Sequence, residues 1–125
     1  MKATDLMIGD WVQSFGEPHK IIGIRTDTPY PYIKTNMSDT WYEWGMKDLA
    51  DGIPLTPEIL KKNADKIDMS YQFGEYPKTM NVMYDSRARA RIMEGDDEYY
   101  GIVLNYVHEL QHALRLFGVE KEIEL

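Results

Sequence analysis

Two histidines and a glutamate stand at a spacing that could support metal chemistry. His108 and His112 are four residues apart in the sequence His-Glu-Leu-Gln-His, and Glu109 directly follows the first histidine. Side chains four residues apart share one face of an α-helix, so both imidazoles could bind one Zn²⁺ ion. Glu109 could then act as the general base for a metal-bound water. This pattern makes a zinc-dependent hydrolase one candidate function.

The surrounding sequence favours an ordinary helix over a zinc site. Catalytic zinc normally has three protein ligands. Resemblance to the metzincin pattern would require Gly at position 115 and a ligand at position 118, where this chain has Arg115 and Gly118. The one remaining histidine is His19, and nothing in the sequence places it near this segment. We therefore predict no catalytic residue, no metal and no cofactor, with the zinc hydrolase as the alternative.

A helical projection at about 100° per residue divides the expected helix 106–117 into two faces. Apolar residues define one face: Tyr106, Val107, Leu110, Ala113, Leu114 and Phe117. The opposite face is polar and contains His108, Gln111, His112 and Arg115. The permanent positive charge of Arg115 opposes zinc binding nearby. We interpret these four polar residues as a solvated or protein-binding surface.

Aromatic residues form a second candidate surface at 41–44. Trp41, Tyr42 and Trp44 could line a groove for a peptide, as aromatic residues do on SH3-like domains. In a small barrel, Trp and Tyr also supply much of the buried area. Both interpretations stay open, and the interpretation as core and rim is favoured.

Three arginines alternate with alanines at 87–91. This period of two is typical of a β-strand and would place Arg87, Arg89 and Arg91 on one face. Such a stripe could contact phosphates, or it could pair across strands with acids such as Glu98. Because further acidic residues follow the expected turn at 94–97, we favour pairing, and nucleic-acid binding is the weaker alternative.

The elements that must position these residues differ between the two parts of the chain. Residues 1–50 read as short strands at 11–15, 20–25, 32–35 and 41–44, separated by turn residues. This pattern predicts a small, bent antiparallel sheet or an SH3-like barrel. We expect it to be the β-rich part of a single domain that spans residues 1–125.

Residues 51–125 contain the predicted helices. Thr56 and Pro57 are typical of a helix start, and Asn63 of a stop in the left-handed conformation. Strands are expected at 69–73, 80–84, 87–91 and 98–104, with a hairpin turn between the last two. An amphipathic helix at 106–117 would follow, capped by Asn105 and ended by Gly118. The tail, 119–125, alternates and could add an edge strand. The predicted fold class is α+β.

The composition limits the function classes. The chain has 125 residues, 43% of them hydrophobic, and a formal net charge of -7. This acidity argues against general nucleic-acid binding, which depends on Lys and Arg. The absence of cysteine excludes disulfides and thiolate catalysis. The start of the sequence lacks the apolar run that a signal peptide or a membrane span would need, so we expect a cytoplasmic protein.

Three segments carry a resemblance to other proteins: 8–12, 53–60 and 106–114. They resemble a group of small uncharacterised proteins from gut bacteria (Bacteroides-type) and their phages. Close relatives in that group resemble this helix only as His-x-Leu-Gln-Asn, which implies that His112 is not an obligatory ligand. The resemblance implies a phage or mobile-element context. We therefore expect an accessory protein that binds other proteins and performs no catalysis.

Overall fold

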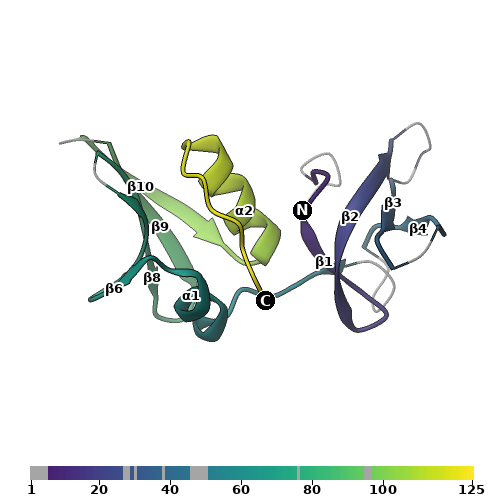
Figure 1. Cartoon of the computed structure of the whole chain (residues 1–125), viewed down its shortest axis with the longest axis horizontal. Helices are drawn as coiled ribbons and strands as arrows, with labels where there is room; N and C mark the ends of the chain where they lie inside the picture. The colour runs from purple at the N-terminus through teal and green to yellow at the C-terminus, as the bar shows by residue number, and fades with distance from the viewer. Residues whose placement is uncertain are drawn as a thin grey trace. The chain divides into compact units, whose positions relative to one another are not determined.

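The computed structural model describes residues 6–26, 29, 31–37, 39–45, 51–75, 77–94 and 97–125, with side chains at all of these except 94 and 97–101. Its contacts divide the chain into two compact units, Met1–Ile53 and Pro54–Leu125 (Figure 1). The division falls close to the predicted change from a β-rich part to a helix-containing part. That the whole chain forms a single domain stays a prediction. No helix in the described ranges is long and apolar enough to cross a membrane.

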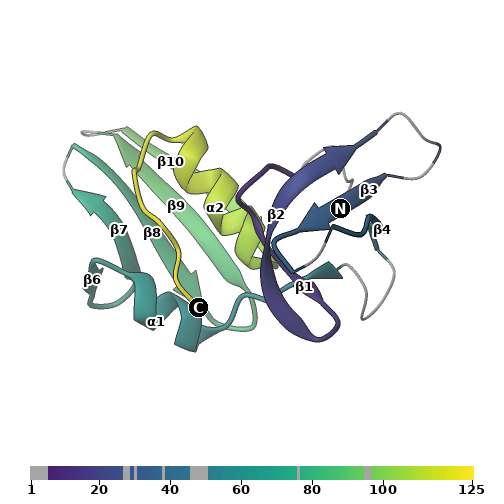
Figure 2. The ribbon, with the colours of Figure 1, turned by 45° about the vertical axis from the view of Figure 1, so that its right-hand side comes forward.

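The first unit contains a curled antiparallel sheet (Figure 2). Its strands are β1 (Trp11–Ser14), β2 (Glu17–Arg25), β3 (Tyr32–Thr35), β4 (Tyr42–Glu43) and β5 (Asp51–Gly52), in the order β4-β3-β2-β1-β5. This arrangement confirms the predicted bent sheet. Among the described residues, the end strands β4 and β5 do not pair with each other, so the sheet is an open half-barrel.

One face of this sheet forms the core of the first unit. Val12, Ile21 and Ile33 are at most 1% exposed, and Leu6 packs with them. The β1–β2 turn lies at Phe15 and Gly16, both with positive φ, of 53° and 76°. Such backbone angles at both central residues match the two-residue turns that suit the twist of a hairpin. The strands expected at 11–15 and 20–25 therefore had wrong limits at this turn, because β1 ends at Ser14 and β2 already begins at Glu17.

The second unit combines a five-stranded antiparallel sheet with two helices. In chain order it contains α1 (Pro57–Asn63), β6 (Lys66–Ile67), β7 (Tyr71–Glu75), β8 (Lys78–Tyr84), β9 (Ala88–Glu94), β10 (Asp97–Leu104) and α2 (Val107–Leu116). The strand order β10-β9-β8-β7-β6 is a simple meander. Figures 1 and 2 show α1, α2 and the C-terminal tail on the same side of the sheet. The α+β class is thereby confirmed.

Alternation along the strands separates a buried face of this sheet from an exposed one. Ala88, Ala90 and Ile92 of β9 are at most 5% exposed, as are Met80 and Val82 of β8. These side chains form one core with buried residues from the helices and the tail: Leu60, Val107, Leu110, Leu114, Val119 and Ile123. A sheet covered on one face only is expected to show this period of two.

Helix α1 begins as predicted and ends differently. The Thr56 hydroxyl accepts a hydrogen bond from the Ile59 N–H at 3.3 Å, and Pro57 occupies the first helical position. Asn63, however, does not adopt the left-handed conformation. It is the last residue of the helix, and the following Ala64 is extended, with φ -63° and ψ 139°. The side chain of Asn63 is buried, and its amide forms hydrogen bonds with the backbone of the C-terminal tail.

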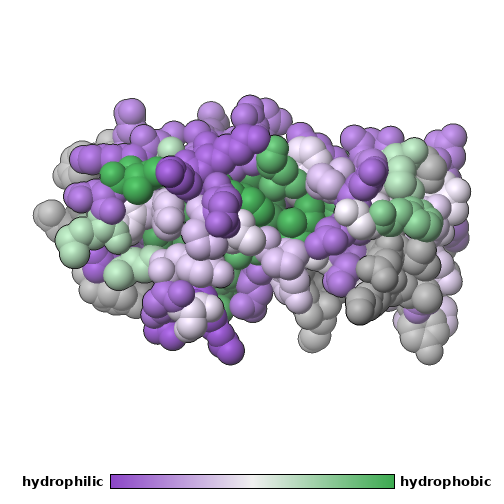
Figure 3. All heavy atoms as spheres, turned by 90° about the horizontal axis from the view of Figure 1, so that it is seen from below, coloured by the Kyte–Doolittle hydropathy of each residue, from purple (hydrophilic) through white to green (hydrophobic). Residues whose placement is uncertain are grey.

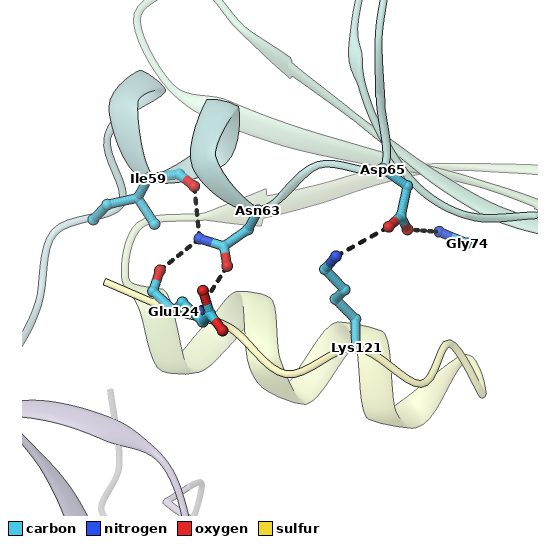
Figure 4. Close-up of polar contacts among 6 residues, drawn as sticks. All are labelled: Ile59, Asn63, Asp65, Gly74, Lys121 and Glu124. Atoms are coloured by element: carbon cyan, nitrogen blue, oxygen red, sulfur yellow. Dashed lines mark hydrogen bonds and ion pairs between the residues drawn. The ribbon is translucent and has the colours of Figure 1, made fainter.

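The tail contradicts the predicted edge strand. Residues 119–125 form no strand, although Val119 and Ile123 alternate inward as their pattern suggested. Side chains of other segments hold this tail instead (Figure 4). The Asn63 amide donates to the Glu124 carbonyl and accepts from the Glu124 N–H, both at 2.7 Å. Lys121 Nζ lies 3.0 Å from the Asp65 carboxylate.

Candidate functional site

His108 was predicted on a solvated helix face and lies in the interior. Its side chain is 0% exposed, so the interpretation as surface was wrong for this residue. The imidazole stacks on the Tyr106 ring with a centroid distance of 5.5 Å and an interplanar angle of 10°. The His112 ring meets it edge-on at 5.9 Å. Gln111 and His112 are half-buried and Arg115 is exposed, so the four residues do not form one solvent-facing surface.

Glu109 has a structural role at the start of α2. Its Oε1 atom accepts hydrogen bonds from the backbone N–H groups of Asn105 and Tyr106, each at 3.0 Å. Tyr106, not the predicted Asn105, is the N-cap residue. Glu109 thus completes the glutamate half of a capping box, and its charge complements the positive helix end.

The zinc hypothesis gains no further ligand from the described part of the chain. Within it, no group of three or more His, Asp or Glu side chains is arranged to hold a metal ion. The carboxylate that would serve as general base is occupied by two backbone N–H groups. The geometry therefore accounts for Glu109 through helix capping, and it supplies no completed ligand set for His108 and His112.

The three aromatic residues at 41–44 do not form one groove. Tyr42 and Trp44 pack against the core of the first unit, and Tyr42 also meets the Phe15 ring edge-on at 5.2 Å. Trp41 instead lies over Gly23 of β2, where a Cβ atom would come within 2.9 Å of the indole. Large aromatics that cover a strand glycine in this way stabilise the sheet. The interpretation of these residues as core and rim agrees with this arrangement.

Two cations flank Trp41. The Arg25 guanidinium and the Lys34 ammonium each lie 5.6 Å from the centroid of the indole ring. Contacts of this kind are attractive by about 0.5–1 kcal/mol at exposed sites. They engage the indole within the chain, so they support a role in covering the sheet more than a role as an open stacking platform.

The second sheet has a face that the helices of its own unit leave uncovered. We define this open face by two rows of cross-strand neighbours. Met83, Arg89 and Val103 form one row across β8, β9 and β10, and Gln72, Asn81 and Arg91 form the other across β7, β8 and β9. Met83 is 55% and Val103 39% exposed, on either side of an exposed Arg89.

Other exposed apolar residues of the second unit are not register partners of Arg89: Ile67, Met69, Tyr84 and Leu116. Figure 3 likewise shows hydrophobic residues, in green, as separate groups among hydrophilic ones on the face it displays. Single exposed apolar side chains are normal on protein surfaces. Met83 and Val103 differ because the strand register places both beside the same arginine.

The arginine stripe is confirmed only in part. Arg89 and Arg91 lie within β9 and alternate with buried Ala88, Ala90 and Ile92. Arg87 precedes the strand in the β8–β9 turn, where its N–H donates to the Asp85 carboxylate at 3.1 Å. The N–H groups of Arg87 and Ser86 lower the pKa of Asp85, and the nearby charge of Arg89 lowers it further. The guanidinium of Arg89 is therefore close enough to the β8–β9 turn to favour the ionised form of the Asp85 carboxyl group.

The apolar half of the open face escaped prediction from the sequence. Met83 and Val103 belong to runs of mixed residues, and they are 20 positions apart, so no local pattern joins them. The signal that could have found them is the hairpin register through β9. Once Arg89 is placed on the exposed face, its neighbours on both adjacent strands must share that face.

Comparisons with known proteins identified no match for this chain among protein-family models, curated proteins or solved structures.

Proposed function

We propose that this chain is a non-enzymatic accessory protein that binds another protein through the open face of its second sheet. We further propose the phage or mobile-element context that was expected from segments 8–12, 53–60 and 106–114. One observation carries the proposal: exposed Met83 and Val103 flank Arg89 on a face that its own unit leaves uncovered.

The composition of this face supports a protein partner. Protein–protein interfaces are enriched in Met and Arg relative to the remaining surface, and Arg is frequent among the residues that dominate binding energy. A polar open face would need no partner, since antiparallel sheets commonly expose one face to water. The pair of exposed apolar side chains would lose contact with water in a complex, which favours association.

Capture with matched variants tests the proposal. The wild-type chain, Met83→Glu and Met69→Glu would be immobilised and exposed to an extract of Bacteroides-type gut bacteria. Met69 is 93% exposed and lies outside the open face, so its variant carries the same substitution at a neutral position. Captured proteins would be quantified, purified and titrated against each chain by calorimetry.

We expect one or more proteins to bind the wild type and Met69→Glu with the same Kd. Met83→Glu should raise that Kd at least about tenfold, which corresponds to about 1.4 kcal/mol. Circular dichroism must show that all three chains are folded. Equal binding of a purified partner to Met83→Glu and the wild type would exclude the open face as its interface.

A further inference from the structure

The C-terminal tail lies against the second unit as a peptide lies in a binding groove. Its first residue, Val119, is tied to α2, because the Val119 N–H donates to the Leu114 carbonyl at 2.9 Å. We call the remaining residues, 120–125, the strap. They form no strand, and side chains at the end of α1 and just after it hold them (Figure 4).

Side chains of the strap alternate between the groove and the solvent. Ile123 is 3% exposed, and Lys121 and Leu125 are half-buried. Between them, exposed glutamates point away from the groove: Glu120, Glu122 and Glu124. This period of two is typical of an extended segment. The groove therefore accepts one basic and two apolar side chains at every second position.

The groove also binds the backbone of the strap. The Asn63 amide donates to the Glu124 carbonyl and accepts from the Glu124 N–H, both at 2.7 Å. Lys62 Nζ donates to the Leu125 carbonyl at 2.6 Å. In peptide recognition, main-chain hydrogen bonds give affinity and pockets for alternate side chains give specificity. A segment of another protein with the same alternation can form the same contacts.

The charge of the strap leaves room for a ligand that binds more tightly. Its three exposed glutamates add to a chain whose net charge is -7, so they are repelled by the molecule that holds them. A segment with basic residues at these outward positions would be attracted instead. The ion pair of Lys121 with Asp65 is accessible to solvent, with side chains 29% and 39% exposed, so it contributes little to holding the strap.

We propose that the groove under the strap binds a basic extended segment of a partner protein, and that the strap is its built-in competitor. The segment has an apolar residue in place of Ile123, a basic one in place of Lys121, and basic residues at the outward positions. A replacement of this kind is required, because an empty groove would expose apolar surface to water.

This site goes beyond the proposed function. It lies on the side of the second sheet that carries the helices, opposite the open face (Figures 1 and 2). The strap of a second copy is a poor occupant. It would make the same contacts as the strap already in place, whose effective concentration within its own chain is on the order of millimolar.

NMR titration of the isotope-labelled full chain tests the inference, with the side-chain amide of Asn63 as the reporter. The first peptide has the sequence of residues 120–125 with Glu120→Lys, Glu122→Lys and Glu124→Lys, and the second has the unchanged sequence. The third is the basic peptide with Ile123→Ser, which keeps the charge and loses the apolar side chain.

Each peptide is titrated against the wild type and three variants of the chain. Ile123→Asp and Lys121→Glu weaken the strap and leave the residues of the groove unchanged. Lys61→Glu is the matched control, because Lys61 is exposed on α1 and its variant makes the same change of charge as Lys121→Glu. Circular dichroism must show that each chain is folded.

We expect the basic peptide to shift the Asn63 amide signals saturably. Ile123→Asp should lower its Kd at least about tenfold relative to the wild type, because the competing strap is weakened. Lys121→Glu should lower the Kd more than Lys61→Glu does. The unchanged peptide should bind more weakly than the basic one, and the Ile123→Ser peptide should not saturate.

Several results would overturn the inference. They are the absence of a saturable Asn63 shift, an equal Kd for the basic and unchanged peptides, and an equal Kd for Lys121→Glu and Lys61→Glu. If Ile123→Asp does not fold, the comparison of Lys121→Glu with Lys61→Glu decides alone. A concentration-dependent dimer of the wild type that Lys121→Glu weakens would assign the groove to a second copy and exclude a different partner.

Discussion

At the scale of single residues, Glu109 is defined by its contacts and not by the motif in which it occurs. Its carboxylate accepts hydrogen bonds from the backbone N–H groups of Asn105 and Tyr106, which would otherwise lack partners at the helix start. The neighbouring His108 is fully buried against the Tyr106 ring. Two residues that suggested hydrolysis in the sequence therefore help to anchor the beginning of α2.

Substitution of Glu109 should affect stability before any chemistry. We expect Glu109→Ala to lower the free energy of unfolding by about 0.5–2 kcal/mol, because two backbone donors lose their acceptor. Glu109→Gln keeps an acceptor oxygen, so it should lower the free energy of unfolding by less than Glu109→Ala does. Chemical denaturation measures both, with Glu120→Ala as an exposed control on the tail. Near-stoichiometric zinc in the purified chain, lost in His112→Ala, would contradict this structural role.

At the scale of elements, the tail is the segment whose placement depends most on a few side chains. Asn63 at the end of α1 uses both ends of its amide on the Glu124 backbone, and it also donates to the Ile59 carbonyl at 2.8 Å. Val119 packs beside Gly74, whose positive φ of 83° and missing Cβ allow that approach. The tail thus closes the core of the second unit without joining a sheet.

Removal of the Asn63 amide should loosen this closure. Asn63→Ala leaves the backbone groups of Glu124 without their partners, so we expect the free energy of unfolding to fall by about 2–3 kcal/mol. Asn105→Ala is the matched control, because Asn105 is exposed and should change stability by less than about 0.5 kcal/mol. Urea denaturation compares the two. Faster hydrogen exchange of the Glu124 N–H in Asn63→Ala would show that the tail is where stability is lost. Equal urea midpoints for Asn63→Ala and Asn105→Ala would contradict the prediction.

At the scale of the whole molecule, stability should depend on pH through carboxylates with lowered pKa values. The Gly74 N–H, which donates to Asp65 at 2.9 Å, is the main cause of the lowered pKa of Asp65. Lys121 lowers that pKa further, against the opposing effect of burial. The pKa of Asp85 is also lowered, mainly by hydrogen bonds from the N–H groups of Arg87 and Ser86. Both carboxylates favour the folded state while they are ionised.

Acid should therefore remove part of the stability. A pKa that is lower in the folded chain than the ordinary 3.8 means that the contribution is complete above that value and disappears as the pH falls through the folded pKa. We expect the difference in unfolding free energy between the parent and Asp65→Asn to be constant at higher pH and to vanish in strong acid. Solvent screening keeps it small, since the Asp65 side chain is 39% exposed.

Urea denaturation across this pH range checks the expectation. Lys121→Gln serves as the comparison, because it removes the ion pair and leaves the Gly74 hydrogen bond in place. It should abolish only a part of the pH-dependent difference. A difference between the parent and Asp65→Asn that is the same at every pH would show that ionisation of Asp65 contributes nothing.

The sequence by itself determined the α+β class, most strands and both helices. These features depend on near neighbours in the chain. Alternation with period two marks β9, the Thr56 cap and Pro57 mark the start of α1, and Gly118 marks the end of α2. Because the responsible residues lie within a few positions of one another, their pattern is visible without the fold.

Only the tertiary structure decided which side chains meet. The Asn63 amide binds a backbone 61 positions away, and a helical projection cannot show that His108 is covered. The open face likewise joins Met83 to Val103 through the register of β9. Periodicity gives the direction of a side chain from its own element. Its neighbours come from segments far along the chain, and their positions are set when the whole core packs.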